Sequence, residues 1–281
     1  MLAQMGMGLT DTVLLGSIGR DALAAGGLGG SVFFVLTGVF QNAVGSIAIL
    51  ISHARGNGNK SSISAILRAG LLLALFCTAP LAVVLWNIEL LLVAIGEPPE
   101  LTDTISIYVQ ILVLGTPAAM VIATFRLYLS AMNYPRLILW IAIFGLIANG
   151  LLDYGLIYGV WGLPQFGYLG SAAATTIVLW AMAIVYAAAI WLTPDARPQQ
   201  LRGGIDWSVF MELNRLGWPI AVLFSVETFM FLAASLLIGT LGSTMLAAHQ
   251  VSIMIASAAF MIPMAIAQAA NVRVGYHLGA N

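Results

Sequence analysis

The sequence predicts an all-α integral membrane protein with about eight transmembrane helices. Of its 281 residues, 61% are hydrophobic and only 7% are charged, whereas soluble domains carry about 25% charged residues. The chain contains eight nearly uncharged stretches, each close to the roughly 20 residues that cross a hydrocarbon core as a helix. The basic residues also fall on alternate connections along the chain, as membrane topology requires.

The first four predicted spans are separated by short polar or charged segments. They lie near residues 1–19, 31–52, 66–88 and 104–125. The first has no charged n-region and no small-residue cleavage site before it ends at Arg20, so we predict a helix rather than a signal peptide. The second ends before Arg55 and the third before Glu89. The fourth contains Pro117, which is expected to bend it.

The last four predicted spans lie near residues 136–158, 170–192, 216–240 and 244–272. The fifth begins at Arg136 and the eighth ends at Arg273. Between the sixth and the seventh spans lies the longest polar stretch, residues 193–215, which is rich in Pro and Gly. Such a composition predicts a linker.

The basic residues predict the orientation of the chain in the membrane. If the N-terminus is cytoplasmic, the loops after the second, fourth, sixth and eighth spans are cytoplasmic too. These loops and the flanking helix ends hold nine of the ten basic residues, namely Arg55, Lys60, Arg68, Arg126, Arg136, Arg197, Arg202, Arg215 and Arg273. Only Arg20 falls on the other side. The positive-inside rule therefore predicts a multi-pass protein with a cytoplasmic N-terminus.

An internal repeat divides the chain into two unequal parts. At an offset of 223, residues 14–25 align with residues 237–248, with six of twelve positions identical, and Gly56 aligns with Gly279. A repeat unit of six helices makes the two copies parallel, related by an axis along the membrane normal. We predict an N-lobe of six helices over 1–192, a cytoplasmic linker over 193–215, and the first two helices of a C-lobe over 216–281. We therefore expect a fragment of a twelve-helix protein, without coupled transport of its own.

Two carboxylates in the predicted N-lobe indicate a functional site. An ionised acid at the centre of a spanning helix costs at least about 2.5 kcal/mol, so such an acid is a candidate for function. Asp11 precedes Arg20 by nine residues, or about 13 Å along a helix, and Asp153 lies about 25 Å from Arg136. Both depths fall in the outer half of the membrane. Asn149 precedes Asp153 by four residues and shares its helix face.

Together, Asp11, Asn149 and Asp153 could form a cage of hard oxygen ligands. Such a cage is suited to a shared proton or to a small cation. Glu227, in the seventh span, is predicted near the midplane and in the other lobe. It could belong to a second site or to the wall of a central cavity. The alternative for every acid is that it only caps a backbone break or pairs with a Tyr or Asn.

Several motifs resemble the multidrug and toxic compound extrusion (MATE) transporters over nearly the whole chain. In the eighth span the motifs are Leu246–Gln250, Phe260–Pro263 and Val272–Gly279. Elsewhere they are Thr10–Thr12, Asn149–Tyr154, Tyr158–Pro164, Gly170–Thr175, and Glu227 followed by Phe231. The resemblance is to the bacterial branch typified by norfloxacin exporters.

The resemblance implies two six-helix lobes arranged as a V, and an antiporter that exports organic, often cationic compounds in exchange for Na⁺ or H⁺. The family's N-lobe cation site falls on Asp11, Asn149, Asp153 and, in the sixth span, Thr175. Its C-lobe acid falls on Glu227. The sequence departs from the family pattern in lacking helices 9 to 12 and the start of helix 1.

Two other functions would require residues that the sequence lacks or places elsewhere. A flippase of lipid-linked precursors, from the same wider superfamily, would need Arg or Lys in the central cavity, whereas the basic residues are predicted at helix ends or in loops. A membrane enzyme would need a closely spaced carboxylate pair, a His-Glu metal motif or a Gly-x-Ser-x-Gly elbow, and the sequence has none. We expect small organic substrates, no cofactor besides the coupling ion, no nucleic acid partner, and a monomer in the bacterial inner (plasma) membrane.

Overall fold

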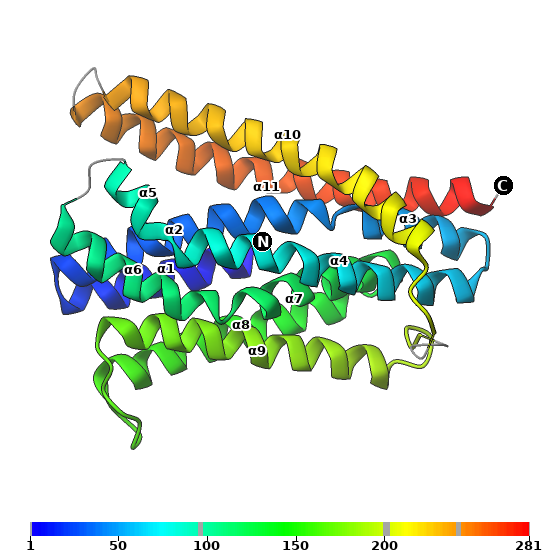
Figure 1. The fold of residues 1–281 in the computed structure, drawn as a ribbon, viewed down its shortest axis with the longest axis horizontal. Helices are drawn as coiled ribbons and strands as arrows, with labels where there is room; N and C mark the ends of the chain where they lie inside the picture. The colour runs from blue at the N-terminus through cyan, green and yellow to red at the C-terminus, as the bar shows by residue number, and fades with distance from the viewer. Residues whose placement is uncertain (1, 95–97, 199–202, 240–242, 281) are drawn as a thin grey trace.

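The computed structural model describes residues 2–94, 98–198, 203–239 and 243–280. All helices and strands assigned in these ranges are α-helices, which pack lengthwise as a bundle (Figure 1). The predicted all-α class is confirmed. Parts of two predictions lie outside the described residues: 199–202 of the linker and 240–242 of the repeat.

The helices of the described ranges correspond to the eight predicted crossings. In chain order they are α1 (Leu2–Ile18), α2 (Arg20–Ala43), α3 (Ser46–Gly56), α4 (Lys60–Trp86), α5 (Ile88–Ala94), α6 (Pro99–Val113), α7 (Thr116–Ala131), α8 (Pro135–Tyr158), α9 (Tyr168–Leu192), α10 (Trp207–Gly239) and α11 (Ser243–Ala280). Among the described residues, six spans are long and apolar enough to cross a membrane, or seven with α6 and α7 as one bent span. The helix α1, of 17 residues, is shorter than these spans and lies over the first predicted crossing.

The fourth predicted span is not one continuous helix. The chain bends by 49° between α6 and α7, and Leu114 and Gly115 lie at the break. Pro117, which was expected inside a helix, is instead the second residue of α7. A proline lacks the N–H that a helix interior needs but is tolerated in the first turn, so the helix restarts just before it.

The seventh crossing begins earlier than the sequence predicted. Residues 207–215, which were expected in the linker, form the first turns of α10. Asp206 caps this helix, because its side chain accepts hydrogen bonds from the hydroxyl and the N–H of Ser208 and from the N–H of Val209. These bonds stabilise the carboxylate and lower the pKa of Asp206 below its usual value.

The helices α10 and α11 lie along one side of the other nine (Figure 1), and their buried positions gather toward one end. Among the α10 residues whose exposure is described, the buried side chains are Phe210, Leu213 and Ala221, all in its first half. Among those of α11, the buried positions are Gly275 and Gly279, near its C-terminus. The two helices therefore make their closest contacts with the rest of the chain at the end where α3 ends and α10 begins.

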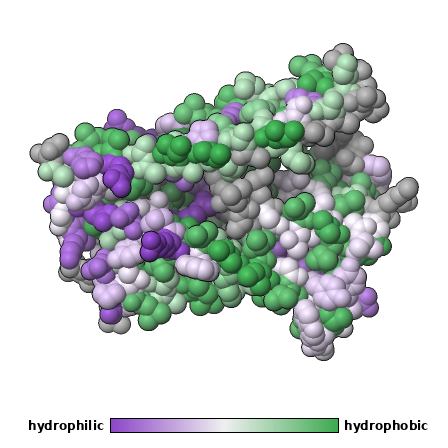
Figure 2. Space-filling model, turned by 180° about the vertical axis from the view of Figure 1, so that it is seen from behind, coloured by the Kyte–Doolittle hydropathy of each residue, from purple (hydrophilic) through white to green (hydrophobic). Residues whose placement is uncertain are grey.

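We call that end the basic end, because Arg55, Lys60, Arg136 and Arg197 all lie at helix termini or connections there. Figure 2 shows hydrophilic residues concentrated at this end, on the left of the view, and hydrophobic residues along the length of the molecule. This distribution is typical of a protein whose sides face lipid.

Candidate functional site

Three helices bring together the four polar residues predicted for the cation site. Asp11 lies on α1, Asn149 and Asp153 lie one turn apart on α8, and Thr175 lies on α9. Asn149 and Asp153 are completely buried, and Asp11 and Thr175 are half-buried. The four side chains thus form one polar cluster, which we call the acid cluster, inside an otherwise apolar bundle.

Long hydrogen bonds connect the members of the acid cluster. The amide nitrogen of Asn149 donates to the Thr175 hydroxyl at 3.4 Å, and that hydroxyl donates to Asp11 Oδ2, also at 3.4 Å. The Asp11 carboxyl also lies beside the carboxyl of Asp153. Both bonds are longer than the usual 2.7–3.2 Å, so the cluster has room to contract around a bound group.

Most oxygen atoms of the cluster lack a hydrogen-bond donor. Among the described residues, none donates to the buried atoms Asp11 Oδ1, Asn149 Oδ1, Asp153 Oδ1 or Asp153 Oδ2. A buried polar group without a partner costs roughly 1–3 kcal/mol. A proton or a small cation among these oxygens would remove that cost. Carboxylate, amide and hydroxyl oxygens are the ligands that hard cations prefer.

Close packing of α9 on α8 places Thr175 within reach of Asn149. A Cβ atom built on Gly170 would lie 2.7 Å from the carbonyl group of Leu156 and 2.9 Å from the nitrogen of Ile157. Only a residue without a side chain permits this approach. Gly170 lies five residues before Thr175, and so it fixes the separation of the two helices close to the site.

Two residues beside the cluster were not predicted from the sequence. Tyr108 of α6 and Ser171 of α9 are both almost completely buried, and their hydroxyls lie 3.3 Å apart in a hydrogen bond. The Tyr108 hydroxyl is also close enough to Asp11 and Asp153 to interact with their charges. Ser171 could have been found, because it precedes Thr175 by four residues and shares its helix face. No sequence signal marks Tyr108.

Glu227 lies apart from the acid cluster. It is exposed on α10, whereas the cluster is formed by α1, α8 and α9. The helix α10 packs on α2, α3, α4 and α11. The structure therefore does not bring the second predicted site into contact with the first.

Arg126 differs from its predicted position. Arg126 was expected at a helix end, but α7 continues to Ala131, so Arg126 lies inside the helix. Its side chain is close to Tyr186 of α9. It therefore packs between α7 and α9.

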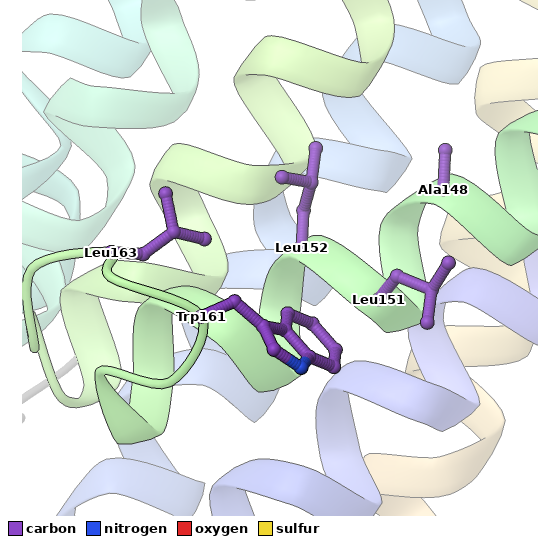
Figure 3. Close-up of a pocket in the computed structure, with 5 residues that line it drawn as sticks. All are labelled: Ala148, Leu151, Leu152, Trp161 and Leu163. Carbon is purple, nitrogen blue, oxygen red and sulfur yellow. The ribbon is translucent and has the colours of Figure 1, made fainter.

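A cavity lies on another face of α8. It has a volume of about 500 Å³ and is lined by Ala148, Leu151, Leu152, Trp161 and Leu163 (Figure 3). All five lining residues are apolar, and Leu151 and Trp161 are exposed. None of the acids of the cluster lines this cavity.

Known proteins share both the sequence and the fold of this chain. The MatE family pattern matches residues 1–155 and 219–281. The multidrug resistance protein NorM of Burkholderia vietnamiensis is 43% identical over 290 residues, covering 99% of this chain and 61% of that protein. A probable multidrug resistance protein NorM of Burkholderia mallei is 41% identical over 280 residues, covering 99% and 60%. The chain thus spans about three-fifths of the length of these relatives.

Solved structures show the same arrangement of helices. The Vibrio cholerae MATE transporter VcmN in its bent form matches with a TM-score of 0.87 at 20% identity, covering 99% of this chain and 63% of that chain. At this identity the likeness concerns the fold. The match to the family pattern, together with the relatives above 40% identity, shows that the chain belongs to the MatE family.

Proposed function

We propose that the chain belongs to a secondary active antiporter that exports organic, often cationic drugs and toxic compounds in exchange for Na⁺ or H⁺. The observation that carries the proposal is the acid cluster, in which two carboxyls adjoin each other and four buried oxygens have no described donor. The names of the relatives, multidrug resistance protein NorM, support the class of cargo.

The chemistry of the cluster suggests how an ion drives transport. Two adjacent carboxylates repel each other when both are ionised, and a proton or Na⁺ between them turns repulsion into attraction. Because Asp11 lies on α1 and Asp153 on α8, occupation of the site draws α1 toward α8. The ion therefore favours the conformation in which these helices are close, and an ion can shift an equilibrium only through such a difference in affinity. We propose that this shift weakens substrate binding and lets the lobes rock to the inward-facing state.

We propose that the basic end faces the cytoplasm of a bacterial cell, with the protein in the inner membrane. The positive-inside rule supports this orientation, because nine of the ten basic residues then lie on the cytoplasmic side. The acid cluster then lies in the outer half of the membrane, where an ion entering from outside reaches it first. We propose that the protein works as a monomer.

The positions of the charges favour a cationic cargo over the anionic head group that a lipid-linked precursor flippase would move. Glu227 is exposed on α10, beyond the buried first half of that helix. Arg126, which lies inside α7, instead packs close to Tyr186 of α9. A carboxylate attracts a cation and repels an anionic head group.

The proposal is tested with the full-length protein in inverted membrane vesicles. We expect uptake of a fluorescent organic cation when either a Na⁺ gradient or a pH gradient is imposed, because uptake into inverted vesicles corresponds to export from the cell. The two gradients are imposed separately, so that the effective one names the coupling ion. Vesicles without the protein are the control. Uptake that depends on neither gradient would contradict coupled antiport.

A further inference from the structure

The helices α3 and α11 run side by side in the same direction toward the basic end (Figure 1). Their backbones touch without intervening side chains. A Cβ built on Gly56 would lie 2.0 Å from the carbonyl oxygen of Tyr276, and one built on Gly279 would lie 2.1 Å from the carbonyl oxygen of His53. One built on Gly275 would lie 3.1 Å from the Cβ of Ser52. The contact therefore depends on glycine at Gly56 and Gly279, whereas a side chain at Gly275 needs a shift of only a few tenths of an ångström.

The contact is reciprocal under the internal repeat. Gly56 and Gly279 are 223 residues apart, and the same offset separates His53 from Tyr276 and Ser52 from Gly275. Gly56 contacts Tyr276, which is the repeat equivalent of His53, and Gly279, the repeat equivalent of Gly56, contacts His53. This is the pattern of an interface on a two-fold axis, in which residue i contacts j and j contacts i. The repeat axis therefore passes between α3 and α11 at the basic end.

The motifs on the two helices are of one type. Ser52 and Gly56 form a small-xxx-small pair on α3, and Gly275 and Gly279 form the matching pair on α11. Such pairs let two membrane helices approach closely and associate through backbone and van der Waals contacts. A contact of this kind does not interlock long side chains, so it can separate and re-form without repacking a core.

Arg55 adds a polar bridge to the same contact. Its guanidinium donates to the carbonyl oxygen of Ala131 at the end of α7 and lies 5.5 Å from the centre of the Tyr276 ring. A cation over an aromatic ring is attracted to it. Arg55 thus joins α11 to α7 as well as to α3.

The contact is confined to one end of α11. Gly275 and Gly279 are the buried positions among the α11 residues whose exposure the structure describes, while Met254, Ile262 and Ile266 are all more than 60% exposed. Buried positions at one end of α11 and exposed positions along the rest are expected for two lobes that form a wedge and touch at one end. The end at which they touch must open when the wedge is inverted.

We propose that Ser52, Gly56, Gly275 and Gly279 form a latch on the internal two-fold axis, which closes the basic end between the lobes and releases once in each transport cycle. This inference rests on the proposed antiport function. In a latch, the contact between α3 and α11 breaks and re-forms in each cycle. In a fixed pivot, the lobes would turn about the contact while it stays intact.

A disulfide across the contact separates these two roles. In the full-length protein, with all native cysteines including Cys77 replaced, Ser52→Cys and Gly275→Cys are introduced together. The 3.1 Å between the two Cβ positions is a few tenths of an ångström below the usual range for a disulfide, which is about 3.5–4.5 Å. A small shift of α11 therefore permits the bond. Its formation is measured by mass spectrometry, independently of transport.

We expect the oxidised pair to lose at least nine-tenths of its ion-driven uptake in inverted vesicles, and reductant to restore it. Ser52→Cys alone, treated with the same oxidant, should keep its uptake. Uptake that survives complete cross-linking would overturn the latch in favour of a fixed pivot, and failure of the pair to cross-link would overturn the contact itself. Absence of uptake in the cysteine-free parent, before any cross-link is made, would instead overturn the proposed function on which the latch rests.

Discussion

Replacement of Asp153 by asparagine is expected to reduce ion-driven transport to the background of vesicles without the protein. Asp153 is completely buried, neither of its carboxylate oxygens has a donor among the described residues, and it adjoins Asp11. An amide keeps the size of the side chain but cannot carry the negative charge or the exchangeable proton. Loss of one charge interaction worth more than about 1.4 kcal/mol suffices for a tenfold effect, and buried charges at short distance exceed this value.

The matched control for this variant is Asp103→Asn. Asp103 is an exposed aspartate on α6, so the same change of chemistry occurs where no buried oxygen cluster exists. Transport should be retained in Asp103→Asn and lost in Asp153→Asn, at equal amounts of protein in the membrane. Full transport by Asp153→Asn would remove the acid cluster from the mechanism.

Replacement of Gly279 by alanine is expected to weaken the closed contact between α3 and α11. The added methyl group would lie 2.1 Å from the carbonyl oxygen of His53, so one helix must move away. Overpacking of a well-packed contact costs typically about 1–3 kcal/mol, or a factor of about 5 to 140 in the population of the closed state. The rate at which the Ser52→Cys/Gly275→Cys pair cross-links should fall accordingly.

Gly30→Ala is the control for Gly279→Ala. Gly30 also lies inside a helix, α2, but a Cβ built on it meets no atom within 4 Å. Alanine has the higher helix propensity, by up to about 1 kcal/mol, so Gly30→Ala should leave both cross-linking and thermal stability unchanged or slightly increased. Equal cross-linking rates in Gly279→Ala and Gly30→Ala would argue against close backbone contact at the basic end.

Charge and hydropathy predicted most of the architecture. Uncharged stretches located the six or seven membrane-capable spans among the described residues, because the cost of burying charge in lipid leaves few alternatives. The sequence predicted Pro117 inside one continuous helix, whereas the structure has two helices joined at Leu114 and Gly115. Hydropathy does not distinguish these two arrangements. The start of α10 was missed because its first turns, from Trp207 to Arg215, are polar enough to resemble a linker, although Asp206 and Ser208 provide a capping signal.

The two carboxylates of the acid cluster were predictable, because a carboxylate without a basic neighbour in an apolar segment has few structural explanations, whereas Thr175 came only from the resemblance to the MATE family. Helix spacing also paired Asn149 with Asp153 correctly on one face. Tyr108 could not be predicted, since its approach to Asp11 and Asp153 depends on how α6 packs. The repeat aligned Gly56 with Gly279, but alignment alone does not reveal that two equivalent positions meet across the axis.

The most direct test of the acid cluster is equilibrium ion binding by the purified full-length protein. Calorimetric titration with Na⁺, together with proton exchange measured at constant pH, is compared between the unmodified protein and the Asp11→Asn/Asp153→Asn variant. If the cluster holds the coupling ion, the unmodified protein binds Na⁺ or exchanges a proton, and the variant loses that event while remaining folded. Undiminished ion binding by the folded double variant would contradict the proposed site.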